Sequence, residues 1–182
     1  MGVRLSGADR REAEMVRLVE PLIPALRRYA RMLSKDRSAA DDLVQDCLER
    51  LFTRWHLRRP DDDLKAWVFT ILHNIAVNHF RRASRHGRQI AIDEIDEAQL
   101  SFPARQEDAV THAQVLAAID RLPDEHRGVF LLIAVEELSY AEAASILDIP
   151  IGTVMSRLHR ARARLQSLLT DNASPPALRI VR

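Results

Sequence analysis

Apolar residues recur every three or four positions through most of this 182-residue chain, and this periodicity constrains its fold more than any other feature. The pattern fills two blocks of the sequence and fades between residues 84 and 107. Only 5 glycines are present, whereas residues with high helix propensity are abundant. We therefore expect an all-α chain with two small helical domains on a flexible linker: residues 8–84, the linker 85–106, residues 107–170, and a tail 171–182.

Prolines and caps divide the first block into separate helices. Pro21 and Pro24 interrupt its first apolar pattern, so two helices are expected over residues 8–33. The next helix begins at the candidate N-cap Ser38, with Asp41 completing a weak capping box. Its apolar stripe consists of Leu43, Cys47, Leu48, Leu51, Phe52 and Trp55. A further helix over residues 64–82 is expected to bury Leu64, Trp67, Val68, Ile71, Leu72 and Ile75.

The last two helices of the second block have the spacing of a helix-turn-helix. Ser139 and Glu142 form a capping box that opens a short helix ending at Leu147. A turn begins at Asp148, where such motifs often have glycine, and the second helix follows over residues 152–169. The pattern predicts a DNA-recognition motif, in which the second helix enters the major groove.

The residues of that second helix support this interpretation. It carries four arginines, and no acidic side chain occurs between residues 150 and 169. Uncompensated arginines on one helix suit the major groove and its flanking phosphates. A solvated basic helix that pairs with carboxylates elsewhere is the alternative, and the preceding capped helix favours DNA binding. The polar residues expected to face DNA are Thr153, Ser156, Arg157, His159 and Arg160.

Two asparagines one turn apart mark the helix over residues 64–82. Asn74, Asn78, Arg81 and Arg82 fall on one stripe of this helix. Asparagine is a middling helix former, and amides and guanidinium groups hydrogen-bond base edges and backbone in unpaired as well as duplex DNA. A hydrated outer face explains the same stripe, so the residues alone leave both interpretations open.

The preceding helix carries charge of the opposite sign. Asp42, Gln45, Asp46 and Glu49 form an acidic ridge opposite the apolar stripe. Such a ridge is usually a solvated face. Because it would repel DNA, a functional ridge would have to bind a basic protein surface.

Composition excludes several other classes of protein. The formal net charge of +1 rules out a uniformly basic nucleic-acid-binding chain. Cys47 is the only cysteine, so an internal disulfide and a cysteine-based zinc site are excluded and a reducing cytoplasm is the simplest setting. The histidines have no metal-ligand spacing, and no nucleophile–base pair stands out. No apolar run approaches the roughly 20 residues of a membrane span. We expect no metal, cofactor, catalytic site or membrane insertion.

Taken together, the motifs of both blocks closely resemble the bacterial sigma-70 superfamily, specifically its extracytoplasmic-function (ECF) sigma factors. Residues 41–46 (DDLVQD) resemble region 2.2, and residues 66–78 (AWVFTILHNIAVN) resemble regions 2.3 and 2.4. Three further segments resemble region 4 and occur in the family's order: 122–127 (LPDEHR), 138–144 (LSYAEAA) and 151–157 (IGTVMSR). The missing region 3 domain fits the ECF subgroup.

The resemblance implies a non-enzymatic transcription initiation factor. Its implied partners are core RNA polymerase, through the β′ clamp helices and the β flap, promoter DNA, and an anti-sigma factor. The acidic ridge would bind the clamp helices, the Asn74/Asn78 stripe with Arg81 and Arg82 would engage the −10 element, and the last helix would read the −35 element.

Two positions depart from the family's pattern. Met155 stands where Lys or Arg is common, and the loop 57–60 lacks an aromatic that some relatives place near the flipped base.

Two other functions fit parts of the sequence. One is an autonomous helix-turn-helix regulator, which would need a dimer interface. The other is a sigma mimic that sequesters a regulator, in which eroded DNA faces are expected.

Overall fold

The computed structural model describes residues 7–59, 62–85 and 106–173, and every regular element in these ranges is helical. The expectation of an all-α chain is therefore confirmed. The predicted linker 85–106 lies outside the described residues except at its two ends, as does most of the predicted tail 171–182.

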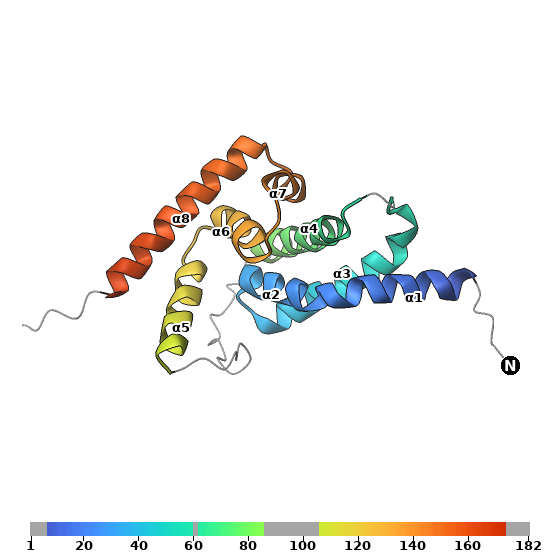
Figure 1. The fold of residues 1–182 in the computed structure, drawn as a ribbon, viewed down its shortest axis with the longest axis horizontal. Helices are drawn as coiled ribbons and strands as arrows, with labels where there is room; N and C mark the ends of the chain where they lie inside the picture. The colour runs from blue at the N-terminus through green and yellow to red at the C-terminus, as the bar shows by residue number, and fades with distance from the viewer. Residues whose placement is uncertain (1–6, 60–61, 86–105, 174–182) are drawn as a thin grey trace, which may run out of the picture.

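The N-terminal half contains α1 (Gly7–Val19), α2 (Ile23–Ser34), α3 (Arg37–Arg54) and α4 (Leu64–Arg85). The predicted proline break is confirmed, because a 3₁₀ turn, η1 (Glu20–Leu22), separates α1 from α2. A second 3₁₀ turn, η2 (Trp55–Leu57), follows α3. Helices α2, α3 and α4 pack on one another around completely or almost completely buried side chains, among them Leu26, Tyr29, Leu43, Phe69 and Leu72 (Figure 1).

The predicted N-cap of α3 is wrong by two residues. Asp36, not Ser38, caps the helix, and its Oδ1 accepts a hydrogen bond from the Ser38 N–H at 2.8 Å. The reason lies in the preceding residue. Lys35 ends α2 in the left-handed region (φ 58°), which turns the chain so that Asp36 is extended and ready to cap.

Some apolar residues are also placed differently from the prediction. Phe52 is 54% exposed, because the buried stripe of α3 that faces α2 and α4 ends at Leu51. Leu64 and Trp67 are only half-buried, and Trp67 packs edge to face on Trp55 with ring centroids 6.2 Å apart.

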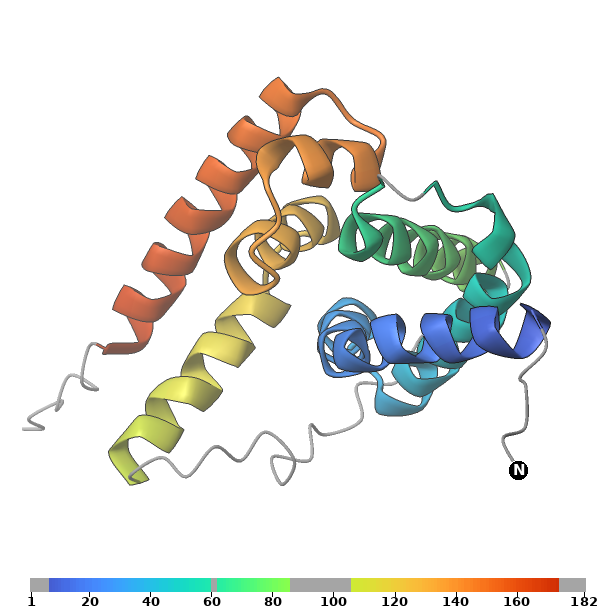
Figure 2. The same ribbon diagram turned by 45° about the vertical axis from the view of Figure 1, so that its right-hand side comes forward.

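The C-terminal half contains α5 (Gln106–Asp120), α6 (Asp124–Phe130), α7 (Tyr140–Leu147) and α8 (Ile151–Ala173). Helix α6 continues into one π-helical turn, η4 (Leu131–Val135). Helix α8 packs against α5, α6 and α7 and lies on the far side of the molecule from α1 (Figures 1 and 2).

The predicted helix-turn-helix is present, and its first helix is capped as expected. The Ser139 Oγ accepts from the Glu142 N–H at 3.2 Å, and the Glu142 carboxylate accepts from the Ser139 N–H at 2.7 Å. Helix α7 ends at Asp148 in the left-handed region (φ 52°, ψ 49°). Asp148 thus adopts the conformation for which such turns often use glycine, and aspartate is one of the few other residues that adopt it occasionally.

The two halves pack against each other through α2 and α4 on one side and α6, η4 and α7 on the other. The buried apolar side chains of both halves form one contiguous cluster. The Glu136 carboxylate, 1% exposed, accepts hydrogen bonds from Arg28 Nε and Nη2 at 2.8 and 2.7 Å. The Glu136 carbonyl accepts from Lys65 Nζ. Arg127, also buried, donates to the Leu33 carbonyl at 3.3 Å. The sequence predicts two domains on a tether, and here these domains are docked by buried polar contacts.

Candidate DNA and polymerase interfaces

The acidic ridge lies on the exposed face of α3. Asp42, Gln45, Asp46 and Glu49 are all exposed, as the sequence predicts, and Gln45 Nε2 donates to Glu49 Oε1 at 3.1 Å. In the part of the chain that the structure describes, no Lys or Arg forms a salt bridge with these carboxylates. Among these described residues, the negative charge of the ridge has no basic partner and faces solvent.

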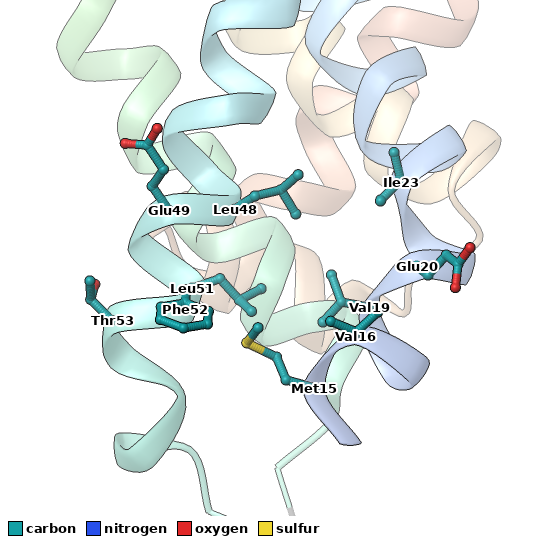
Figure 3. A pocket seen from close by; sticks show the side chains of 10 residues that line it. All are labelled: Met15, Val16, Val19, Glu20, Ile23, Leu48, Glu49, Leu51, Phe52 and Thr53. Atoms are coloured by element: carbon teal, nitrogen blue, oxygen red, sulfur yellow. The ribbon is translucent and has the colours of Figure 1, made fainter. Parts of the chain in front are cut away.

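An apolar groove adjoins the ridge and was not predicted from the sequence. It lies between α1 and α3, with Glu49 at its edge (Figure 3). Two large apolar side chains on its walls are half in solvent, Val16 at 50% and Phe52 at 54% exposed. The lining residues are Met15, Val16, Val19, Glu20, Ile23, Leu48, Glu49, Leu51, Phe52 and Thr53. A groove with an apolar floor and an acidic rim is suited to a protein partner.

The predicted stripe on α4 faces solvent. Asn74, Asn78, Arg81 and Arg82 are exposed, while the opposite face buries residues such as Leu72. The amides and guanidinium groups lie along one side of the helix over more than one turn. The four side chains of this stripe comprise hydrogen-bond donors and acceptors and include no carboxylate.

His73, next to this stripe, is held in the core. Its Nδ1 lies 3.0 Å from the hydroxyl of Tyr29, which is completely buried. Burial lowers the pKa of His73 to about 4, so its ring is neutral near pH 7. Burial also raises the pKa of Tyr29, and the nearby Glu136 carboxylate adds to that shift. His73 therefore adds no charge to the α4 stripe at neutral pH.

Helix α8 is held in the fold by one face and exposes the other. Val154 and Leu158 are buried, as the sequence predicts. Ser156, His159 and Arg160 are exposed, whereas Thr153 is half-buried. The Ser156 hydroxyl donates to the Thr153 carbonyl at 3.0 Å, within the helix. Exposed and partly exposed polar groups thus cover more than one turn at the amino end of α8.

Arg157 is placed differently from the other predicted DNA contacts. Its side chain is 26% exposed, and Nη2 lies 2.8 Å from Glu125 Oε2. Glu125 belongs to the first turn of α6. The ion pair therefore ties α8 to α6.

The amino end of α8 also exposes two large apolar side chains. Ile151 is 47% and Met155 52% exposed. They are four residues apart, so they lie on the same side of the helix.

The described residues offer little for other chemistry. Cys47 is fully buried, and burial raises the pKa of its thiol to about 12, with a smaller opposing effect from Arg50. Over residues 7–59, 62–85 and 106–173, no group of three or more His, Cys, Asp or Glu side chains is placed to hold a metal ion. None of the helices in these ranges is both long and apolar enough to cross a membrane.

Comparison with known proteins identifies the family. Residues 19–73 match the sigma2 domain of PhyR, and residues 112–165 match sigma-70 region 4. The ECF RNA polymerase sigma factor EcfG of Rhodopseudomonas palustris is 33% identical over 150 residues, which is 81% of this chain and 80% of EcfG. The chain belongs to the ECF sigma factor family. SigL of Mycobacterium tuberculosis, another ECF sigma factor, is 31% identical over 92% of this chain and 96% of SigL.

Two solved structures have the same fold as this chain. RpoE of Bartonella quintana, in complex with the anti-sigma factor NepR, matches with a TM-score of 0.75 at 33% identity over 86% of this chain and 97% of RpoE. CnrH, in complex with the cytosolic domain of CnrY, matches with a TM-score of 0.66 at 27% identity over 92% of this chain and 96% of CnrH. ECF sigma factors direct RNA polymerase to promoters, so this chain is a transcription initiation factor.

Proposed function

We propose that this sigma factor binds core RNA polymerase through α3 and holds promoter DNA with α4 and α8. The observation that supports this division is the segregation of charge between surfaces. The exposed face of α3 is acidic, whereas α4 and α8 expose amides, hydroxyls and arginines. Helix α8 also lies on the opposite side of the molecule from α1 and the groove that α1 forms with α3 (Figures 1 and 2). One chain can then contact a basic protein surface and DNA at the same time.

The polymerase contact combines the acidic ridge with the apolar groove. Asp42, Gln45, Asp46 and Glu49 supply charge and hydrogen bonds for the β′ clamp helices. The exposed ring of Phe52, at the groove, supplies apolar area. Protein interfaces draw most of their affinity from such apolar and aromatic anchors, and the charged rim adds orientation and a faster approach.

The −10 contact is made by the stripe on α4. Asn74 and Asn78 offer amides to base edges, and Arg81 and Arg82 offer guanidinium groups to phosphates. Melting the −10 element unstacks bases at a cost of a few kcal/mol each, and contacts to the exposed strand offset this cost. Because the stripe carries no carboxylate, it does not repel the strand.

The −35 contact is made by α8, which enters the major groove. Ser156, His159 and Arg160 are exposed for this contact, and Thr153 lies at its edge. Arg157 reaches DNA only by exchanging its ion pair with Glu125, so its main contribution is to fix the angle of α8 on α6. Residues 107–170 form the unit that carries this contact, and residues 8–84 form the unit that binds polymerase and the −10 element.

An anti-sigma factor regulates this chain, and the chain acts in the cytoplasm with the polymerase. The proposal rests on the two relatives whose solved structures are complexes with NepR and with the cytosolic domain of CnrY. An inhibitor of this kind would have to compete with core polymerase.

Charge reversal on α3 tests the assignment of the polymerase surface. The variants Asp46→Lys and Glu49→Lys should each weaken binding of purified core polymerase roughly tenfold or more, since like charges across an interface cost several kcal/mol. The matched control is Glu137→Lys, the same charge change at an exposed position in the C-terminal half. Equal affinity for all four proteins, measured by fluorescence anisotropy of labelled protein, would refute the role of the ridge.

One alanine substitution on each of α4 and α8 tests the DNA surfaces in the assembled holoenzyme. Arg160→Ala should reduce binding to duplex that contains the −35 element, and Asn74→Ala should reduce capture of the single-stranded −10 element. Neither variant should change core binding. The assignment fails if each variant affects both DNA elements equally.

A further inference from the structure

The amino end of the recognition helix exposes apolar side chains where a DNA reader needs chemistry for base edges. Ile151 is the first residue of α8, and Met155 follows one turn later on the same side. Both are about half exposed, at 47% and 52%. Within the described chain, no other large apolar side chain of α8 is this exposed. Two exposed apolar side chains next to each other form a small contiguous patch, and such patches mark interaction sites when they are rimmed by polar residues.

Position in the helix decides which side chains meet bases first. In a helix-turn-helix, the amino-terminal residues of the second helix contact base edges. Arg157, the first arginine of α8, is engaged by Glu125 at 2.8 Å. Arg160 follows almost a turn later. The first base edges are therefore met by Ile151 and Met155, together with the hydroxyl of Ser156.

Charge on the rest of the helix favours DNA as the occupant of this apolar pair. No carboxylate occurs between residues 150 and 169, and Arg160, Arg162 and Arg164 are exposed. An apolar patch that continues into an acid-free arginine surface matches the major groove, where base edges that include the thymine methyl lie between phosphates. The patch is continuous with the proposed −35 surface on the same helix.

The major groove has one strongly apolar group, the C5-methyl of thymine. Cytosine presents hydrogen at that carbon, and uracil differs from thymine only by lacking the methyl. We infer that Ile151 and Met155 recognise thymine methyl groups in the −35 element. This inference rests on the proposed function of α8. It explains part of the sequence preference of α8 by apolar contact with thymine and not by a hydrogen bond between arginine and guanine.

The expected effect is modest and measurable. Burying one methyl group contributes about 0.8 kcal/mol, which is roughly fourfold in affinity. Loss of one contacted methyl should weaken binding about fourfold, and loss of two about fifteenfold. Hydrogen bonds to the same base are unchanged when thymine is replaced by uracil, so the measured change reports the methyl group alone.

The experiment replaces each thymine of the −35 element by deoxyuridine, one at a time. The duplex comes from a promoter mapped with this sigma factor, and binding of the assembled holoenzyme is measured by competition. Wild-type protein should lose about fourfold at one or two positions and be indifferent to uracil elsewhere. Met155→Ala or Ile151→Ala should bind the uracil and thymine duplexes equally at those positions, and Met155→Lys should shift the preferred base there towards guanine.

Controls separate this inference from the proposed function. Both residues are exposed, so the alanine variants should keep the circular dichroism spectrum and the core affinity of the wild type. Scrambling the −35 element tests α8 as a reader. If scrambling weakens binding and no uracil substitution does, the methyl contact is refuted and the proposed function stands. If scrambling has no effect, both fail. Loss of core affinity in Met155→Ala would assign the patch to a protein contact and overturn the inference.

Discussion

The ion pair between Arg28 and Glu136 joins the two halves, and its unequal burial makes a specific prediction. The Arg28 side chain is 41% exposed, whereas that of Glu136 is 1% exposed. Removing Arg28 leaves a carboxylate buried without its bidentate partner. Removing the charge of Glu136 leaves a guanidinium group that water already reaches. The two single variants should therefore differ in stability, although they break the same contact.

The magnitudes follow from the cost of an unpaired buried charge. Arg28→Ala should lower the free energy of unfolding by about 3–5 kcal/mol, the range for breaking a buried pair from one side. Glu136→Gln keeps the shape of the side chain and one acceptor oxygen, so it should cost about 1–2 kcal/mol. The double variant Arg28→Met with Glu136→Gln removes both charges and should be more stable than Arg28→Ala alone.

Urea denaturation with two probes measures this difference. Trp55 and Trp67 both lie in the N-terminal half, so their fluorescence reports that half, while circular dichroism at 222 nm reports all helices. In Arg28→Ala, separation of the two halves would also expose the Glu136 carboxylate to water. The unfolding transitions followed by fluorescence and by circular dichroism would then diverge, and the radius of gyration measured by solution scattering would increase. Equal destabilisation by the two single variants, or a larger cost for Glu136→Gln, would refute the reasoning.

Three further predictions concern other contacts. Gly128→Ala should raise stability by about 0.5–1 kcal/mol in thermal unfolding, because alanine favours the helix and its Cβ would meet Leu147 Cδ2 at an unstrained 3.8 Å; a loss of stability would show a clash. The pKa of His73 is about 4 in the fold, whereas its ordinary value is 6.5. As the pH drops, His73 therefore takes up a proton in the unfolded chain before it does so in the folded chain. The free energy of unfolding should then fall between about pH 6.5 and pH 4, by up to roughly 3 kcal/mol. His73→Gln should flatten that slope, and an unchanged slope would exclude His73 as its source. Glu125→Ala and Arg157→Ala should each weaken −35 binding by a similar factor and together by no more than either alone; stronger DNA binding by Glu125→Ala would show that the released Arg157 reads DNA.

Features set by neighbouring residues were the most predictable from the sequence. The break between α1 and α2 follows from Pro21, since proline cannot donate within a helix. The capping box of Ser139 and Glu142 is determined within four residues, and the structure forms it as predicted. Exposure of the acidic ridge and the α4 stripe follows from the position of the apolar stripes on the same helices.

Features that depend on distant residues were not predictable in this way. Arg28 and Glu136 are 108 positions apart, and no local pattern indicates that they meet. Their pairing docks two units that the sequence presents as separate. The exposure of Phe52 has the same origin, because helical spacing places it beside Leu51 and only the packing of α2 and α4 decides where the buried stripe ends. The pairing of Arg157 with Glu125 likewise required the placement of α8 on α6.

The exposed charged and polar side chains are segregated between surfaces of the fold. Acidic and apolar groups gather on α3 and the adjoining groove, and amides and arginines gather on α4 and α8. The near-zero net charge of +1 is therefore a sum over surfaces of opposite sign. One small chain can therefore offer an acidic surface to a basic protein partner and a separate surface of amides and arginines to DNA.

Transcription from fragmented genomic DNA with purified core polymerase, with and without this protein, tests the central claim most directly. The account predicts that the protein creates discrete start sites that share a −10 and a −35 sequence. Arg160→Ala should weaken starts that depend on the −35 sequence, and Asp46→Lys should weaken all of them. Start sites that are identical with and without the protein would contradict the account.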